Sequence, residues 1–332
     1  MQATYCYRRC IPLSWTTFSH PLKMKKRLTA FLCLLVVCVF TSVFWSTLSA
    51  DMLLFRGDAS YYFSLIDNSE WTAVYPHEPM LFILARGGDS FWVYLLTSIF
   101  ICNFLVAWAA LSSRYRLIDS ILIILFFSFS FYGAHLSVNF QRQFLALGFF
   151  LCAISYLKVP LASLLLAVFS FLSHQFAFIL FASYALARLP RRAVLAAATA
   201  VSLMLLGLTL SDASISIYAS AVGDDFSKYV AKQIIAIAFA MYIYNQAKRS
   251  CDPFVANYAL LYTIVAAPVI VSPGYAGLFS RVDYFLFPFM VYLWPRVSTR
   301  RGFDRVLFLA FIACSGYLWL QLNFSWIINA EE

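Results

Sequence analysis

Long apolar runs separated by short polar connections follow one another along most of the chain. Leu28–Leu48 is the clearest of them, since it contains no charged residue. A helix of about 20 residues, rising about 1.5 Å per residue, crosses a hydrocarbon core of about 30 Å. The runs predict about eleven helices, near residues 28–48, 91–111, 117–134, 142–157, 160–173, 175–187, 193–210, 231–247, 254–271, 282–294 and 306–320.

These helices predict an all-α fold, a polytopic bundle of transmembrane segments. Several runs are too short to cross a bilayer alone, so we expect some short or re-entrant segments. The composition agrees with a membrane protein: 63% of the residues are hydrophobic, 12% are charged and the mean hydropathy is +0.80. We divide the chain into a basic leader, one transmembrane domain, two larger outer loops and an outer tail, at residues 1–27, 28–320, 51–89, 211–230 and 321–332.

The basic residues give the orientation, because Lys and Arg accumulate beside helices on the cytoplasmic side. With the N-terminus in the cytoplasm, the outer segments hold only six of the 24 basic residues, namely Arg56, Arg86, Arg142, Lys228, Lys232 and Arg281. The acids do the opposite, and only three of the 15 are inside, namely Asp119, Asp252 and Asp304. The net charge of +9 therefore follows from topology, and it gives no reason to expect nucleic-acid binding.

The same charge distribution decides how residues 160–187 fold. They could form one long helix or two short helices with a turn at Ser173-His174. One helix would place the later basic clusters, such as Arg191-Arg192, on the outer side. We therefore predict the hairpin, which brings His174 to the outer level of Arg142 and Arg281.

Three ionisable residues lie at the depth of the membrane. Arg142 belongs to the polar stretch 137–143 between two apolar runs, and His174 and Arg281 repeat the pattern. A charged side chain at membrane depth costs about 2.5–3.5 kcal/mol on insertion scales, so it is retained where it lines a cavity and meets a polar partner. We expect any chemistry at this outer level. His135, at a predicted helix end, carries less weight.

The first outer loop, residues 51–89, mixes acids with aromatic residues. Aromatic faces stack on sugar rings, and carboxylates accept hydrogen bonds from sugar hydroxyls. A solvated loop with an interfacial aromatic belt has the same composition, and on residue types alone it is the simpler interpretation. The polar and aromatic residues of this loop that suit sugar recognition are Arg56, Asp58, Tyr61, Tyr62, Asp67, Glu70, Trp71, Tyr75 and Glu78.

The order of short motifs along residues 55–290 resembles the EpsG group within the Wzy-type polysaccharide polymerases. The motifs are Asp58 with Tyr61, Glu78-Pro79 before an apolar segment, Arg142-Gln143-Phe144-Leu145-Ala146, Phe171-Leu172-Ser173-His174, and Arg281 with Tyr284-Phe285. Each motif is short, and the specificity lies in their order and depth.

The resemblance implies a polymerase of bacterial O-antigen, capsule or exopolysaccharide in the inner membrane, with its active site facing the periplasm. Such an enzyme joins oligosaccharide repeat units carried on undecaprenyl pyrophosphate, without a cofactor or a metal ion. Direct displacement of the lipid carrier would invert the anomeric configuration. A flippase and a chain-length regulator are the protein partners that the resemblance suggests.

Within that scheme we assign roles to the polar residues at the outer level. Arg142 and Arg281 would neutralise the departing pyrophosphate, because guanidinium groups hold phosphate oxygens with paired donors. Each could instead reach lipid headgroups or pair with an acid such as Asp283. His174 would deprotonate or orient the attacking hydroxyl, or serve as a hydrogen-bonded group at a turn. Asp58 and Glu78 are rival bases, and the predicted substrate-binding residues are Arg56, Tyr61, Tyr62, Asn139, Gln143 and Tyr284.

Three other functions fit part of the pattern. Another polyprenyl-phosphate-dependent glycosyltransferase would use an acid of the first outer loop as its base, and an O-antigen ligase would share the arginines and the histidine. A flippase for the lipid-linked repeat is the alternative outside the enzymes. It predicts ionisable residues distributed through the depth of the bundle, whereas here they gather on one side.

Overall fold

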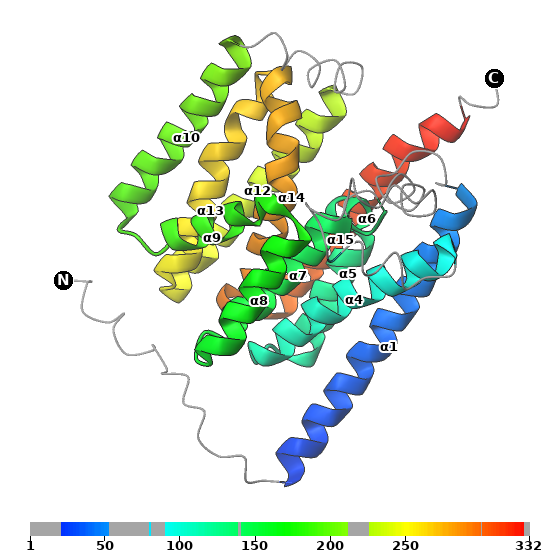
Figure 1. Cartoon of the computed structure of the whole chain (residues 1–332). Coiled ribbons are helices and arrows are strands. Elements are labelled where there is room, and N and C mark those ends of the chain that lie inside the picture. Colours follow the sequence, from blue (N-terminus) through cyan, green and yellow to red (C-terminus); the bar gives the residue numbers. More distant parts are fainter. Residues whose placement is uncertain are drawn as a thin grey trace.

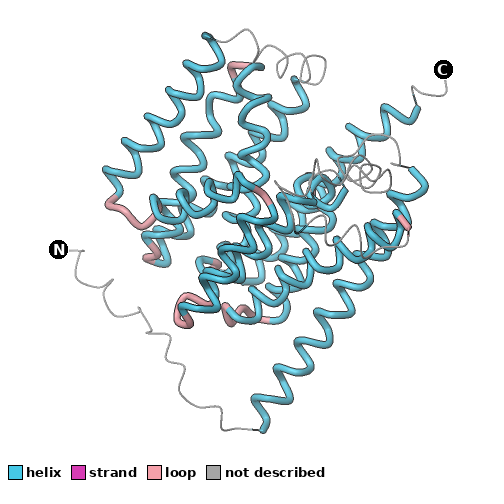
Figure 2. The backbone as a smooth tube through the Cα atoms, viewed as in Figure 1, coloured by secondary structure: helices cyan, strands magenta, loops and turns pink. Residues whose placement is uncertain are grey.

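The computed structural model describes residues 21–52, 80, 90–138, 141–211, 226–299 and 301–328, and all of its regular elements are helices (Figure 2). For these residues the all-α prediction is confirmed. The elements are α1 (Pro21–Met52), α4 (Phe91–Ser112), α5 (Leu117–Phe129), α6 (Phe131–Val138), α7 (Gln141–Ser155), α8 (Pro160–Ser173), η3 (Gln175–Ala177), α9 (Phe178–Leu186), α10 (Arg191–Ser211), α12 (Phe226–Ser250), α13 (Pro253–Ala266), η5 (Ala267–Ile270), α14 (Pro273–Val297) and α15 (Arg301–Ile328).

The helices form two groups joined by α14 (Figure 1). On one side α1, α4, α7 and α8 pack each against the next, and on the other side α10, α13 and α12 do the same. Helix α14 contacts α7 as well as α12 and α13, and α15 packs against α5 and α6. This central place lets α14 touch residues from most of the bundle.

The predicted count of eleven membrane spans is not confirmed. By length and composition, three described segments can cross a bilayer, at Arg27–Thr47, Phe91–Ser112 and Pro253–Ile270. A fourth is obtained when α5 and α6 are taken as one bent span. Each predicted run does coincide with a helix, but α7 and α8, with 15 and 14 residues, are shorter than the hydrocarbon core requires.

The bend between α5 and α6 measures 67° and falls at Ser130, whose backbone is extended. The Ser130 hydroxyl accepts a hydrogen bond from the Gly133 N–H at 3.0 Å and so caps the new helix. A Cβ atom at Gly133 would lie 2.4 Å from the Phe126 carbonyl oxygen. Glycine is therefore required at position 133 for α6 to bend away so close to the last turn of α5.

The turn predicted at Ser173-His174 is present. Helix α8 ends at Ser173, and the rings of Phe171 and Phe181 stack with centroids 5.0 Å apart. In a continuous helix ten residues would separate them by about 15 Å along the axis. The chain therefore changes direction sharply at His174.

Hydrogen bonds define the register of α7 against α8. The Ser170 hydroxyl donates to the Ala146 carbonyl at 2.8 Å, and the Ser163 hydroxyl donates to the Ala153 carbonyl at 2.9 Å. The two helices are therefore antiparallel. Arg142 comes four residues before Ala146, and His174 comes four residues after Ser170. These two residues therefore lie at one level, as the charge distribution predicted.

Three ion pairs each join residues that were predicted on one side of the membrane: Arg305–Asp119 at 2.8 Å, Arg296–Asp252 at 2.9 Å and Lys232–Asp283 at 2.8 Å. We call the end of the bundle that carries Asp119 and Asp252 the inner end, and the end that carries His174 and Asp283 the outer end. The helices thus keep the charges of each predicted side together.

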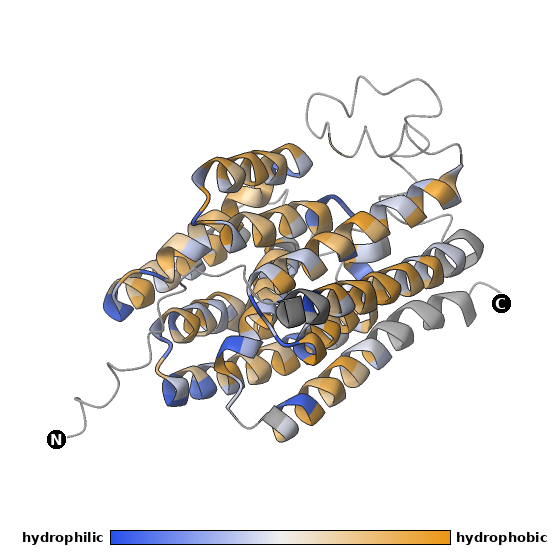
Figure 3. Cartoon of the chain, turned by 90° about the horizontal axis from the view of Figure 1, so that it is seen from below, coloured by the Kyte–Doolittle hydropathy of each residue, from blue (hydrophilic) through white to orange (hydrophobic). Residues whose placement is uncertain are grey.

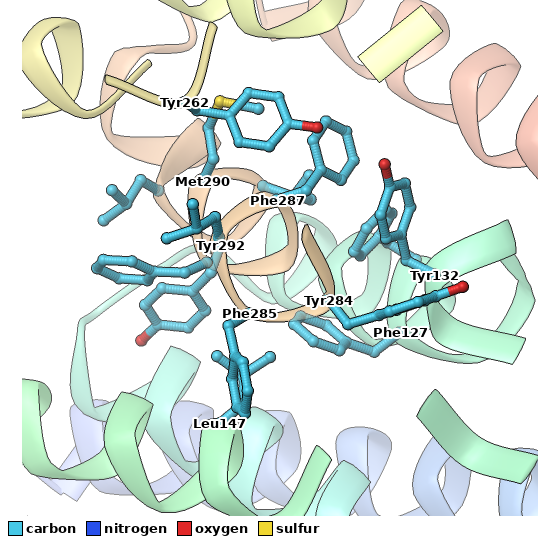
Figure 4. Close-up of a cluster of buried hydrophobic side chains, with 14 of the residues drawn as sticks. Phe127, Tyr132, Leu147, Tyr262, Tyr284, Phe285, Phe287, Met290 and Tyr292 are labelled. Carbon is cyan, nitrogen blue, oxygen red and sulfur yellow. The ribbon is translucent and has the colours of Figure 1, made fainter. Parts of the chain in front are cut away.

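The peripheral helices expose apolar side chains. Val36 on α1, Leu161 on α8 and Leu203 on α10 are all more than 60% exposed. Figure 3 shows hydrophobic residues along most of each helix and hydrophilic residues near helix ends. Buried aromatic rings fill the space around α14, among them Phe127, Phe287 and Tyr292 (Figure 4). An apolar exterior around a packed interior is the pattern of helices embedded in lipid.

Candidate functional site

A buried carboxylate joins four helices at the outer end. Asp283 on α14 is completely buried and accepts three hydrogen bonds of 2.8 Å, from the Tyr132 hydroxyl, the Lys232 ammonium and the Tyr262 hydroxyl. The Gln233 amide donates to the Tyr262 hydroxyl at 2.7 Å. We call these five residues the Asp283 cluster. Because a buried charge costs several kcal/mol unless it is paired and hydrogen-bonded, the cluster fixes α14 against α6, α12 and α13.

Aromatic rings surround the ammonium group of Lys232. Its Nζ lies 4.8 Å from the ring centroid of Tyr132, 5.1 Å from Phe131, 5.2 Å from Tyr284 and 5.7 Å from Tyr229. Cation–π attraction at such distances stabilises a desolvated ammonium group. Figure 4 shows Tyr132 and Tyr284 together on one side of α14 and Tyr262 on another.

Two histidines contact consecutive residues of α14. The His174 ring lies 5.6 Å from the Phe285 ring, and the His135 ring lies 5.6 Å from the Tyr284 ring. His174 is 5% exposed, and its Nδ1 accepts a hydrogen bond from the Phe176 N–H at 3.4 Å. The imidazole therefore caps the short helix that follows the turn, which is the structural role that the sequence also allowed.

Arg142 lies in the first turn of α7, at the level of His174. Its side chain is partly buried. On either side of it, Gln141 and Gln143 are 3% and 5% exposed, and the Oε1 atom of each lacks a hydrogen-bond partner among the described residues. The N-terminus of a helix carries free N–H groups and a partial positive charge. This turn thus combines a guanidinium group and a helix dipole, which suit an anion, with two acceptors, which suit hydroxyl donors.

Arg281 lies in α14, one turn before Phe285, and its side chain is outside the described part of the structure. Residues four apart in a helix occupy the same face. Position 281 therefore shares a face with the phenylalanine that contacts His174. The helices bring the backbone positions of Arg142, His174 and Arg281 to one end of the bundle.

A comparison with protein families shows which family the chain belongs to. The model of the EpsG family matches residues 58–327, which is most of the chain. The chain belongs to the EpsG family. This family is one of EpsG-type polysaccharide polymerases, which are membrane proteins, and it was the family that the order of motifs indicated. No curated protein and no solved structure matches the chain.

Six of the residues that the sequence suggested for the EpsG site lie outside the described residues, namely Arg56, Asp58, Tyr61, Tyr62, Glu78 and Asn139. Gln143 is at the outer end, beside Arg142. Tyr284 is 3% exposed and packs between Tyr132 and His135. Its ring belongs to the wall around Lys232 in this structure.

The Asp283 cluster of this EpsG protein was not predicted. Asp283 was considered as a partner for either arginine, and in the structure its carboxylate binds Lys232. A lysine at the start of an apolar helix is itself a sign of function at membrane depth, so Lys232 could have been found from the sequence. The tyrosines gave no such sign, because their role arises only when α6, α13 and α14 pack together.

Proposed function

We propose that this EpsG protein joins oligosaccharide repeat units carried on undecaprenyl pyrophosphate, at the periplasmic face of the bacterial inner membrane. The observation that carries the proposal is the level shared by Arg142 and His174, next to the helix that carries Arg281, in a chain of a polysaccharide polymerase family. The outer end would be the periplasmic end.

The reaction is a displacement at the anomeric carbon. A hydroxyl oxygen of one repeat unit forms a bond to C1 of the growing glycan, and the bond from C1 to the pyrophosphate oxygen breaks. The electron pair of that bond leaves with undecaprenyl pyrophosphate, and the hydroxyl proton passes to the His174 imidazole. Attack opposite to the leaving group inverts the configuration at C1.

The guanidinium groups would act on the leaving group. Negative charge accumulates on the pyrophosphate as the bond breaks, and a guanidinium is always ionised and offers paired donors to phosphate oxygens. The dipole of α7 acts in the same direction as Arg142. We therefore assign charge neutralisation to Arg142 and Arg281, in a reaction that uses no metal ion and no nucleotide sugar.

The neighbouring amides would hold the sugar. Gln141 and Gln143 each present a buried acceptor oxygen without a partner among the described residues, and such groups are satisfied in most proteins. Hydroxyl groups of a glycan are suitable donors. Arg56, Asp58, Tyr61, Tyr62, Glu78 and Asn139 complete the proposal as acceptor-binding groups, with Asp58 and Glu78 as rival bases.

The test is the size profile of surface and lipid-linked glycan in a bacterial host that lacks this protein. The host is complemented with the wild type, with Arg142→Ala, or with Arg192→Ala as a control at an exposed inner position. We expect long polymer from the wild type and the control, and single repeats that reach the surface from Arg142→Ala, with equal amounts of protein in the membrane.

Other outcomes would replace the proposal. If the host without the protein places no repeats on its surface, a flippase or an earlier glycosyltransferase is indicated. Long polymer retained on its polyprenyl carrier would indicate a ligase. Normal chain lengths in the Arg142→Ala strain would remove Arg142 from the mechanism.

A further inference from the structure

A cavity of about 960 Å³ lies at the inner end, far from the site described above. Its walls come from the connection between α9 and α10 and from the connection between α12 and α13. Three basic side chains line it, Arg188, Arg191 and Lys248, together with apolar residues such as Leu189 and Phe254. The cavity is therefore cationic on part of its surface and mostly apolar elsewhere.

Tyrosine rings hold the three cations in place. The Arg188 guanidinium lies 4.5 Å from the Tyr184 ring centroid and donates a hydrogen bond to the hydroxyl of that tyrosine. Arg191 and Lys248 both lie near the Tyr244 ring, at 5.6 Å and 5.4 Å from its centroid. Such contacts restrain long side chains without neutralising their charge.

No carboxylate of the described residues balances these charges. Within the described part of the chain, none of the three cations has an acid within ion-pair distance. Asp252 also lines the cavity, but its Oδ2 binds Arg296 at 2.9 Å and its Oδ1 accepts from the Val255 N–H at 3.1 Å. Two cations beside one ring repel each other, and a bound anion would remove that repulsion.

The walls of the cavity are tied together before any ligand binds. The Asn257 side chain on α13 donates hydrogen bonds to the Ala187 and Leu189 carbonyls, at 3.1 Å and 3.0 Å. These bonds fix the α9–α10 connection, and with it Arg188, against α13. A preorganised site loses less entropy when a ligand binds.

From these observations we propose that the cavity binds the phosphate headgroup of an anionic phospholipid. The guanidinium and ammonium groups would hold the phosphate oxygens, and the apolar wall formed by Leu189, Pro190, Pro253 and Phe254 would receive the start of an acyl chain. Basic pockets between helix ends at a membrane surface recognise such headgroups. A soluble phosphate would use the same cations but not the apolar wall, and for this reason we favour the lipid.

The test uses the full-length purified chain in nanodiscs made of phosphatidylcholine alone or with phosphatidylglycerol, and it measures Tm by intrinsic fluorescence. We expect phosphatidylglycerol to raise Tm of the wild type. The triple variant Arg188→Gln, Arg191→Gln and Lys248→Gln should lose this rise while keeping its Tm in phosphatidylcholine. The control Arg116→Gln, Arg192→Gln and Arg249→Gln removes three exposed basic residues outside the cavity and should keep the rise.

Two further measurements make the result decisive. Ala256→Leu keeps all three cations but fills part of the cavity, and it should lose the rise even if the triple variant fails to fold. Inorganic phosphate added to phosphatidylcholine nanodiscs identifies the source: a rise that the triple variant lacks would assign the site to a soluble phosphate instead. An equal rise in wild type and Ala256→Leu, or an equal loss in the control triple, would overturn the proposal.

Discussion

Lys232 and Asp283 are 51 residues apart in the chain, yet their side chains meet at 2.8 Å in an interior where neither is more than 4% exposed. Lys232 belongs to α12 and Asp283 to α14. The pair therefore holds α12 against α14 at the outer end, and the positions of the residues there depend on it.

Removing one member of this pair should destabilise the folded protein severely. Asp283→Asn would leave the Lys232 ammonium buried without its anion, which costs about 3–5 kcal/mol. We expect a large drop in Tm of the purified protein and a lower amount in the membrane. The double variant Lys232→Met with Asp283→Leu removes both charges and should recover part of the loss. An Asp283→Asn protein as stable as the wild type would mean that the pair contributes little.

Arg142→Lys separates charge from geometry. Lysine keeps the positive charge but cannot form the paired hydrogen bonds that a guanidinium makes with phosphate. We expect polymerisation to fall at least tenfold, about 1.4 kcal/mol of transition-state stabilisation, with normal membrane insertion. The rate of repeat-unit addition in membranes with lipid-linked substrate measures this. Equal rates for Arg142→Lys and the wild type would indicate that charge alone matters.

The His174→Asn variant separates the helix-capping role of His174 from its proposed role as the general base. Asparagine is among the best helix-capping residues and can accept the hydrogen bond from the Phe176 N–H, but it cannot take up a proton near neutral pH. We expect a protein with nearly wild-type Tm that makes no long polymer. If chain lengths stay normal, His174 is a capping residue, and a base must be sought elsewhere, with Asp58 and Glu78 first.

Gly316→Ala tests the close approach of α15 to α5. A Cβ atom at Gly316 would lie 2.3 Å from the Phe129 carbonyl oxygen, a backbone atom that cannot move aside alone. We expect a loss of about 1–3 kcal/mol in stability, typical of overpacking. Gly207→Ala is the control, since among the described residues no atom outside its own helix turn lies within 4 Å of that Cβ, and alanine favours a helix by about 1 kcal/mol. A higher Tm for Gly316→Ala would mean that the two helices separate easily.

The sequence predicted the helices better than the contacts between them. Apolar runs gave both ends of α8 correctly, and counting charges gave the turn at His174 and its level with Arg142. The bend at Ser130 was missed, because no proline and no change of hydropathy marks it. The count of spans was too high, because an apolar run that forms a helix need not be long enough to cross a bilayer.

For the candidate site, the sequence could identify single residues by their cost in a membrane, as it did for Arg142. The sequence could not predict the contact between Lys232 and Asp283, because that contact depends on which face of α12 packs against α14. The role of Tyr262 was hidden for the same reason, since a tyrosine in an apolar helix fits a core position equally well.

The contacts of Tyr284 and Phe285 give α14 a further role. Successive residues of an α-helix point about 100° apart around its axis, so His135 and His174 approach α14 from different directions. Asp283, the residue just before them, is anchored by three other helices. The Asp283 carboxylate thus fixes the rotation of α14 about its own axis. Any rotation of α14 would displace Tyr284 from His135 and Phe285 from His174 at the same time.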